Sequence, residues 1–257
     1  MTGRERIGKI FAQRGARTLL MTHAIGGWPD EATSEAIVRT MLAEGADLVE
    51  IQVPFSEPAA DGPAIVAASH EALAGGMTTA RTLALIGRLR RGAGAKALLV
   101  MTYLNPVLAY GEEAFVRDAV TAGVDGLIVP DCPLDEISPL PELAAAAGLA
   151  FVPLVAPATS DRRIAEICAR FVSPFVYAVL RLGVTGRATG IDAATRAYLE
   201  RVARAAGRGV AAGFGIRERG QIEALAGAVD CAVAGSVFIQ AVRDARAWRP
   251  VPRRRRA

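Results

Sequence analysis

Two carboxylates, Glu50 and Asp61, stand eleven residues apart in a segment where acid–base chemistry could take place. Glu50 lies inside the apolar run LVEIQV, residues 48–53, which predicts a buried parallel strand. A buried carboxylate usually has a partner, a raised pKa or a chemical task, because burying an unpaired charge is costly. Pro54 and Pro58 end the strand and stiffen the loop toward Asp61, so both carboxylates can face one ligand. On residue types alone, a salt-bridged Glu and a turn-forming Asp remain the alternative.

The elements that must position these carboxylates follow from the alternation of short apolar runs with longer Ala/Leu/Arg-rich segments. The expected strands are Thr18–Thr22, Leu48–Val53, Ala97–Thr102, Gly126–Val129, Ala150–Leu154, Phe175–Val179, Gly209–Ala212 and Cys231–Ala234. The expected helices include Glu31–Glu44, Ala80–Arg91, Glu113–Ala122, Leu140–Ala147, Asp161–Cys168, Ala193–Ala206 and Arg217–Ala226. Eight strands alternating with helices predict an α/β fold, a (β/α)8 TIM barrel, with a doubly wound sheet as the competing architecture.

Barrel geometry places the carboxyl ends of the strands and the loops that follow them on the active-site face. Tyr103 and Asn105 follow the third expected strand, and Asp131 follows the fourth. Tyr177 lies on the sixth, and Glu50 on the second. We therefore expect these side chains to gather at one end of the barrel.

Glycine-rich segments follow the last two expected strands. Gly213, Phe214 and Gly215 come after the seventh strand, and Gly235 and Ser236 come after the eighth. Glycines let backbone N–H groups approach an anion, and the start of a helix adds a favourable dipole. Because barrels commonly bind phosphate with these two loops, the pair predicts a phosphate site.

The stretch from residue 48 to 63 resembles the active-site segment of the tryptophan synthase alpha subunit family, the indole-3-glycerol-phosphate lyases. That pattern is an apolar-Glu-apolar strand followed by P-F-S-[D/E]-P and A-D-G-P, and the similarity extends roughly from Ile7 to Val242. The segment Gly183-Val184-Thr185-Gly186 resembles the mobile closing loop of the family. Glycine hinges around a hydroxyl also suit a lid that excludes water.

The resemblance implies a retro-aldol cleavage of indole-3-glycerol phosphate to indole and glyceraldehyde 3-phosphate. It makes Glu50 the acid/base, Asp61 the carboxylate that accepts the indole N–H, and Tyr177 a hydroxyl near the reacting centre. The implied substrate-binding residues are Tyr103, Thr185, Gly186 and Phe214, and the implied phosphate-binding residues are Gly186, Gly213, Gly215, Gly235 and Ser236. Indole would pass to a tryptophan synthase beta subunit in an α2β2 complex for tryptophan biosynthesis. No metal or cofactor is expected in this chain, since pyridoxal phosphate would belong to the beta partner.

Three positions depart from the usual family pattern. Gln52 stands where most members have Gly, so its side chain must either point away from the cavity or contribute to it. Glu57 stands where many members have Asp, and Arg181 is preceded by Leu180 rather than the commoner Ser. These changes indicate a divergent branch.

Two further polar residues are not placed in the catalytic set. His23, at the end of the first expected strand, could touch a ligand, but a structural hydrogen bond is favoured. Asp131 stands beside Pro130 and is more typical of a turn.

Composition narrows the classes of function. The net charge is +4, and residues 253–256 alone are four arginines, so the rest of the chain is nearly balanced, which argues against a nucleic-acid-binding face. The three cysteines are widely spaced and fit free thiols in a reducing cytoplasm. The charged N-terminus is unlike a signal peptide, and no apolar run reaches membrane-spanning length.

No linker divides the chain, so we expect a single catalytic domain over residues 1–248 and a basic, disordered tail over residues 249–257.

Three other functions remain open at this stage: a free-standing indole-3-glycerol-phosphate lyase, another phosphate-sugar barrel such as an isomerase or epimerase, and a non-catalytic barrel that activates a beta subunit. An isomerase needs a different acid/base pair and an epimerase usually needs metal ligands. The intact carboxylates argue against a non-catalytic role.

Overall fold

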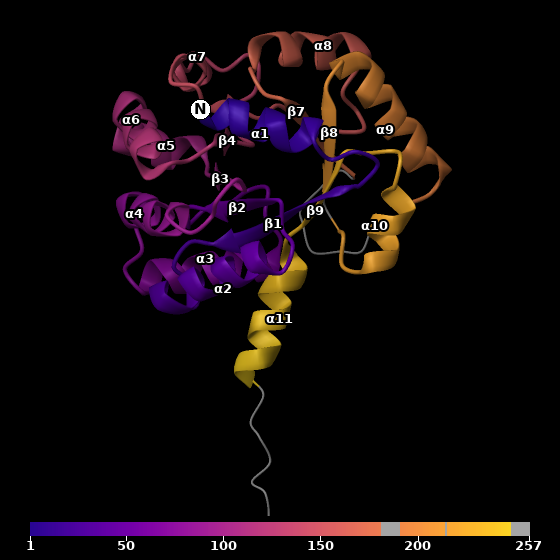
Figure 1. Ribbon diagram of the computed structural model, residues 1–257. Helices are drawn as coiled ribbons and strands as arrows, with labels where there is room; N and C mark the ends of the chain where they lie inside the picture. Colours follow the sequence, from indigo (N-terminus) through magenta and orange to yellow (C-terminus); the bar gives the residue numbers. More distant parts are fainter. Residues whose placement is uncertain (181–190, 214, 248–257) are drawn as a thin grey trace, which may run out of the picture.

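A parallel sheet forms the centre of the molecule (Figure 1). The computed structural model describes residues 1–180, 191–213 and 215–247. Within them the strand order is β5-β4-β3-β2-β1-β9-β8-β7-β6, and every neighbouring pair is parallel. The strands are β1 Leu19–Ile25, β2 Leu48–Gln52, β3 Ala97–Met101, β4 Gly126–Ile128, β5 Ala150–Phe151, β6 Leu154–Val155, β7 Phe175–Val179, β8 Gly209–Gly213 and β9 Cys231–Ala234.

The two ends of this strand order are the halves of one extended segment, residues 150–155. β5 pairs with β4 and β6 pairs with β7, so the segment closes the sheet on itself and the expected barrel is confirmed. The sequence predicted one fifth strand, Ala150–Leu154, and the structure corrects this to two short strands. Pro153 separates them because proline has no N–H to continue a ladder, although its carbonyl still accepts from Tyr177 N–H at 2.8 Å.

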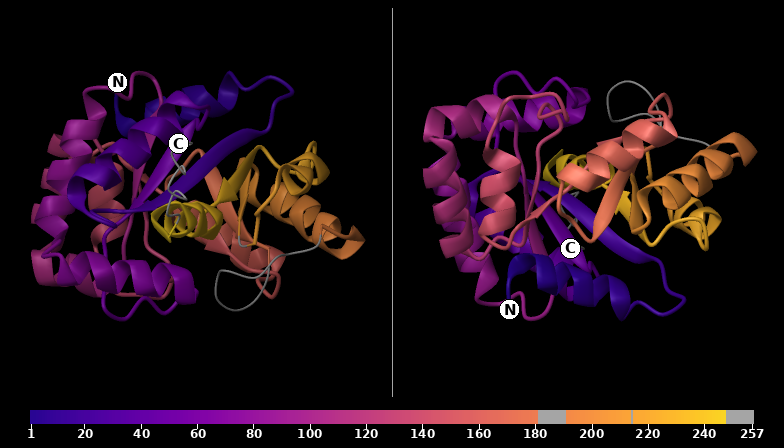
Figure 2. Two further views of the ribbon diagram at one scale, coloured as in Figure 1. Left: turned by 90° about the horizontal axis from the view of Figure 1, so that it is seen from below. Right: turned by 90° about the horizontal axis from the view of Figure 1, so that it is seen from above.

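Helices surround the sheet on the outside (Figures 1 and 2). They are α1 Gly3–Ala12, α2 Glu31–Ala43, α3 Pro63–Ala74, α4 Thr79–Arg90, α5 Leu104–Tyr110, α6 Glu112–Ala122, α7 Leu140–Ala146, α8 Asp161–Arg170, α9 Ala193–Ala206, α10 Arg219–Leu225 and α11 Ser236–Ala247. The helices expected from the sequence are all present, with ends that differ by at most two residues. None of the described helices is long and apolar enough to cross a membrane.

Helix α1 closes the amino-terminal end of the barrel. A capping box at Thr2 starts the helix, and its fully buried Ile7 packs among the first residues of several strands. Phe11 stacks on Phe175 at a ring-centroid distance of 5.0 Å. With its amino end filled in this way, the barrel is left with its carboxyl end for a ligand.

The register of the strands decides which side chains face the barrel interior. Leu48 is buried in the interior cluster, and since side chains two apart share a face, Glu50 and Gln52 face the same way. Glu50 is paired in register with His23 of β1 and with Leu99 of β3. His23 therefore lies within β1, not after it as the sequence suggested, and its side chain faces the interior beside Glu50.

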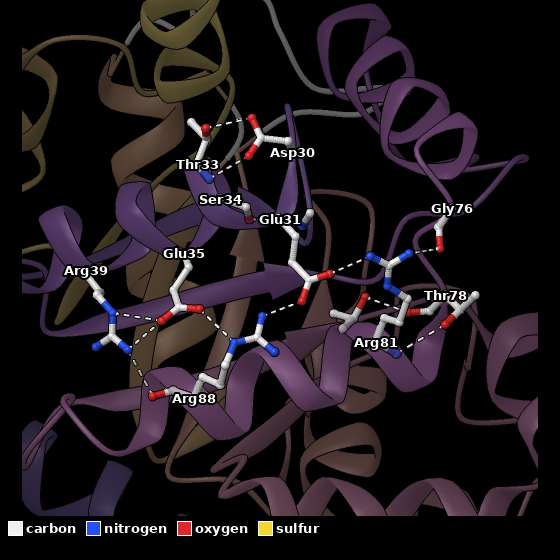
Figure 3. A network of polar contacts seen from close by, with 12 residues as sticks. Asp30, Glu31, Thr33, Ser34, Glu35, Arg39, Gly76, Thr78, Arg81 and Arg88 are labelled. Atoms are coloured by element: carbon white, nitrogen blue, oxygen red, sulfur yellow. Dashed lines mark hydrogen bonds and ion pairs between the residues drawn. The ribbon is translucent and has the colours of Figure 1, made fainter.

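A network of ion pairs joins α2 to α4 on the outer surface (Figure 3). Glu31 contacts Arg81 and Arg88, and Glu35 contacts Arg88 and Arg39. These groups are partly exposed, so solvent screens each pair and its contribution to stability is small.

A second carboxylate between two arginines, Asp125, lies at the amino end of β4 and is fully buried. Its side chain pairs with Arg6 of α1, and with Arg90 of α4 at 2.8 Å, and it also accepts the Leu98 N–H at 2.8 Å. This single side chain thus connects two helices and a strand.

We expect Asp125→Ala to lower the free energy of unfolding by about 3–5 kcal/mol, because it removes the buried carboxylate that two part-buried guanidinium groups and the Leu98 N–H share. Glu35→Ala is the matched control: it also sits between two arginines but is partly exposed, so a loss of about 1 kcal/mol or less is expected. Denaturant unfolding of both variants measures the difference. Equal losses would contradict this account of burial.

Candidate active site

A pocket opens at the carboxyl ends of the strands. Side chains from β1, β2, β3, β4, β6, β7 and β9, and the loops after β2, β4, β8 and β9, form its walls. The residues that matter for chemistry are His23, Glu50, Asp61, Tyr177, Gly215, Gly235 and Ser236. The structure therefore brings the two carboxylates and parts of both expected phosphate loops around one cavity.

Glu50 lies in the middle of β2 and only 6% of its surface is exposed. Burial raises its pKa to about 7, and the charge of Asp61 adds to the rise while His23 opposes it. A carboxyl group with a pKa near 7 can both give and take a proton at neutral pH.

Asp61 reaches the pocket from the loop between β2 and α3. The turn that presents it is closed by a hydrogen bond from Asp61 N–H to Pro58 C=O at 2.9 Å. Its Oδ2 accepts from Gln52 Nε2 at 2.7 Å and from the Tyr103 hydroxyl at 3.0 Å. Burial raises the pKa of Asp61, and His23 and these two hydrogen bonds oppose the rise.

Tyr103, which the resemblance makes a substrate-binding residue, donates its hydroxyl proton to Asp61 Oδ2 in the structure. The hydroxyl oxygen accepts the Ala60 N–H at 3.1 Å, and the ring packs against Phe55 at a centroid distance of 5.5 Å. Tyr103 thereby fixes the loop at Ala60 and at Asp61. It contacts the pocket wall through its hydrogen bond to the Asp61 carboxylate.

Gln52 contributes to the site and does not point away from it. The side chain is fully buried, with Oε1 at 2.7 Å from His23 Nε2 and Nε2 at 2.7 Å from Asp61 Oδ2. Sequence reasoning found the unusual residue but missed its two partners. The signal available in the sequence was a second polar residue two positions after Glu50, on the same face of the strand.

Tyr177 lies in β7 with its side chain in the barrel interior. Burial, followed by the nearby charge of Glu50, raises the pKa of its hydroxyl well above 10, so the group stays protonated. Gly213 at the end of β8 makes room for it, since a Cβ added there would lie 2.2 Å from the Tyr177 oxygen. Gly213 therefore has a packing role that its place in a phosphate-type loop did not reveal.

The other end of the pocket is formed by Gly215, Gly235 and Ser236. Ser236 is the first residue of α11, a helix of 12 residues, so the positive end of the helix dipole is directed here. Gly215 has a φ of 101°, which favours glycine, and its carbonyl is fixed by Gln221 Nε2 at 2.9 Å. Gly235 packs closely on His23, since an added Cβ would lie 3.3 Å from the His23 Cβ.

Some expected site residues lie outside the described residues: Thr185 and Gly186 in the predicted lid, and Phe214. Asp131 is described and lies outside the pocket wall. Its carboxylate accepts the Leu104 N–H at 2.8 Å at the start of α5, which agrees with a structural role.

No group of three or more His, Cys, Asp or Glu side chains within residues 1–180, 191–213 and 215–247 could hold a metal ion. The three cysteines are buried free thiols, far apart in the sequence.

Comparison with known proteins agrees with this geometry. Residues 11–252 match the family model of the tryptophan synthase alpha chain. The tryptophan synthase alpha chain of Gluconacetobacter diazotrophicus is 44% identical over 241 residues, which cover 93% of this chain and 88% of the relative. That of Phenylobacterium zucineum is 41% identical over 242 residues, 93% of this chain and 87% of the relative.

Among solved structures, tryptophan synthase of Mycobacterium tuberculosis superposes with a TM-score of 0.85 at 34% identity, covering 93% of this chain and 91% of that one. The family model spans most of the chain, and the alignments with the curated relatives cover most of both sequences. The chain therefore belongs to the tryptophan synthase alpha chain family.

Proposed function

We propose that this chain cleaves indole-3-glycerol phosphate to indole and glyceraldehyde 3-phosphate, the reaction of its family. One observation carries the proposal: Glu50, with a pKa raised to about 7, shares a pocket with the carboxylate of Asp61. The opposite side of the same pocket has the features of a phosphate site. A substrate with an aromatic N–H at one end and a phosphate at the other fits this arrangement.

Glu50 is the acid/base of the proposed mechanism. A proton is added to C3 of the indole ring, and the neighbouring side-chain hydroxyl loses its proton as its oxygen becomes the aldehyde C=O. The carbon–carbon bond breaks, and its electron pair returns to the ring and restores aromaticity. A carboxyl group of pKa near 7 suits both proton transfers.

Asp61 stabilises the ring while it carries positive charge. Its carboxylate accepts the indole N–H, and the interaction strengthens as C3 is protonated. Tyr177, protonated and buried beside Glu50, is a hydroxyl donor near the reacting centre. Gly215, Gly235 and Ser236 bind the phosphate with backbone N–H groups and the Ser hydroxyl. The assignment of Thr185, Gly186 and Phe214 to substrate or phosphate binding rests on the resemblance alone. The same holds for Gly213 as a phosphate-binding residue.

The partner in this proposal is a tryptophan synthase beta subunit in an α2β2 complex, which receives the indole and contains the pyridoxal phosphate. This chain needs no cofactor of its own, because proton transfers alone complete the cleavage. Buried free thiols fit a reducing cytoplasm as the place of reaction. Residues 1–248 form the catalytic domain in this proposal, and residues 249–257 form a basic tail.

The first prediction concerns Glu50. Glu50→Gln keeps the shape of the side chain and removes the titrating group, so the rate of indole formation should fall by at least about a hundredfold. Binding of glycerol 3-phosphate, measured by calorimetry, should change little. A variant that cleaves at the wild-type rate would remove Glu50 from the mechanism.

Ser236 tests the phosphate end. Ser236→Ala removes a hydroxyl beside the start of α11, and a hydrogen bond to a charged group contributes about 1.5–3 kcal/mol, so glycerol 3-phosphate should bind about 10- to 100-fold more weakly. Ser69→Ala is the control, because Ser69 is also buried but lies in α3, away from the pocket wall. Unchanged affinity in Ser236→Ala would place the anion elsewhere.

A third prediction concerns Glu57 and the acceleration of cleavage by a beta subunit. This residue is exposed on the short loop that joins the Glu50 strand to Asp61, and Pro54 and Pro58 on either side are buried. A beta subunit that orders this loop would accelerate cleavage, since misplacing a catalytic group by about 1 Å can cost about a hundredfold. Glu57→Ala should abolish most of this acceleration and leave the basal rate unchanged.

The control is Glu44→Ala, an exposed Glu just before the opposite end of β2. Steady-state indole formation is measured for the wild type and both variants across a titration of beta subunit. A wild-type rate that is high alone and does not respond to the partner would instead indicate a free-standing lyase.

A further inference from the structure

The side-chain amide of Gln52 links two residues of the pocket wall without being part of that wall. Its oxygen lies 2.7 Å from His23 Nε2, and its nitrogen lies 2.7 Å from Asp61 Oδ2. The residue is fully buried, so neither amide atom can exchange its partner for water. Loss of one contact would leave a buried polar group unpaired.

The direction of this amide follows from Asp61. The Tyr103 hydroxyl takes the Ala60 N–H on its oxygen, so its proton is free to point at Asp61 Oδ2. A reversed Gln52 amide would place two acceptor oxygens 2.7 Å apart, which an ionised carboxylate cannot tolerate. The NH2 group of Gln52 therefore faces Asp61.

The proton of His23 is placed by the same argument. Gln52 Oε1 can only accept, so the His23 Nε2 that contacts it carries a proton. His23 Nδ1 is then an acceptor if the ring is neutral and a donor if the ring is charged. It is buried and has no hydrogen-bond partner among the described residues.

A ligand hydroxyl can supply the missing partner in either case, because a hydroxyl both donates and accepts and His23 lines the pocket. His23 lies beside Glu50, its partner in the strand register, and its Nδ1 is on the side of Gly235, 3.7 Å from a Cβ built there. It therefore lies between the proposed acid/base and the proposed phosphate loop. In the proposed substrate, the groups between the cleaved bond and the phosphate are the hydroxyls of the glycerol chain.

The contact between Gln52 and Asp61 orients the Asp61 carboxylate. Among the described residues, both hydrogen bonds to its carboxylate fall on Oδ2, one from Gln52 and one from Tyr103. Oδ1 is then the oxygen available to the N–H of an indole ring. Two donors on one oxygen also favour the ionised form of the carboxylate.

We propose that Gln52 is a positioning residue, which directs Asp61 Oδ1 at the indole N–H and holds His23 with its Nε2–H on Gln52 Oε1, so that His23 Nδ1 binds a hydroxyl of the substrate's glycerol chain. The identity of the ligand groups rests on the proposed function. The link between the three side chains does not.

The first test measures the pKa of Asp61 in the protein without ligand. The titratable groups that face Asp61 are His23 of β1, Glu50 of β2, Tyr103 after β3 and Tyr177 of β7. Gln52→Met keeps the length of the side chain and removes the donor, so the pKa of Asp61 should rise in a carbon-13 NMR titration of the carboxyl groups. Gln240→Met, on the exposed side of α11, should leave this pKa unchanged. An unchanged pKa of Asp61 in Gln52→Met would overturn the proposal.

A second variant keeps this test decisive if Gln52→Met does not fold. Gln52→Glu has the same shape and keeps an acceptor for His23, but it places a carboxylate against Asp61. One of the two carboxyl groups must then take up its proton at a higher pH than Asp61 does in the wild type. If both carboxyl groups of Gln52→Glu titrate at or below the wild-type pH of Asp61, the contact is absent and the proposal fails.

The His23 half is tested with two stable ligands in calorimetry. Glycerol 3-phosphate contains the hydroxyls, and propyl phosphate does not. His23→Phe should weaken glycerol 3-phosphate about three- to tenfold, the value of one neutral hydrogen bond, and leave propyl phosphate unchanged. Equal weakening of both ligands, or weakening of neither, would overturn the hydroxyl assignment.

Measurements of turnover then distinguish a failure of this inference from a failure of the proposed function. With Asp61 needed in its ionised form, activity is lost as the pH falls through its pKa, so the acidic limb of the kcat/KM profile should lie at a higher pH in Gln52→Met than in the wild type. A wild-type protein that releases no indole would refute the proposed function, while the NMR titration would still decide the link. An active wild type whose pH profile and kcat are unaltered by Gln52→Met would refute the link and leave the function standing.

Discussion

The pairing of β2 with both β1 and β3 is the constraint on which the site depends. In this register Glu50 lies between His23 and Leu99 and faces the barrel interior. A slip of one residue would turn every side chain of β2 to the opposite face and take Glu50 and Gln52 out of the site. Closure at the divided fifth strand completes the barrel, and the catalytic geometry is therefore a consequence of backbone pairing that no single side chain sets.

The buried carboxylates at the two ends of the barrel have different kinds of hydrogen-bond partner. At the amino end, Asp125 is met by two guanidinium groups and serves to hold helices and sheet together. At the carboxyl end, no arginine or lysine is among the described residues of the pocket wall, and Asp61 receives its hydrogen bonds from the neutral Gln52 and Tyr103. Burial raises the pKa of all three carboxyl groups, but only at Asp125 do two guanidinium groups oppose the rise. The same residue type is thus structural at one end and suited to proton chemistry at the other.

Much of this arrangement could be predicted from the sequence, because it depends on local pattern. Apolar runs located the strands, and the motif around Glu50 and Asp61 identified two carboxylates that the structure brings to one pocket. The link between Gln52 and His23 could not be predicted, since it joins residues 29 apart through the register of two strands. The division of the fifth strand was missed although Pro153 was visible, because the apolar run continues across it. Thr185, Gly186 and Phe214 remain predictions from the motif alone.

Glycines show how one residue type serves two purposes in this pocket, and why motif and packing must be considered together. Gly213 lies in a loop typical of phosphate binding, yet its missing side chain is what admits the Tyr177 hydroxyl to the barrel interior. Gly235, in the second phosphate-type loop, lets the His23 ring lie against the backbone. A side chain at either position would therefore disturb the reacting centre as well as the phosphate end. In the proposed site the acid/base end and the phosphate end are accordingly coupled, because His23 and Tyr177 pack closely on the phosphate-type loops.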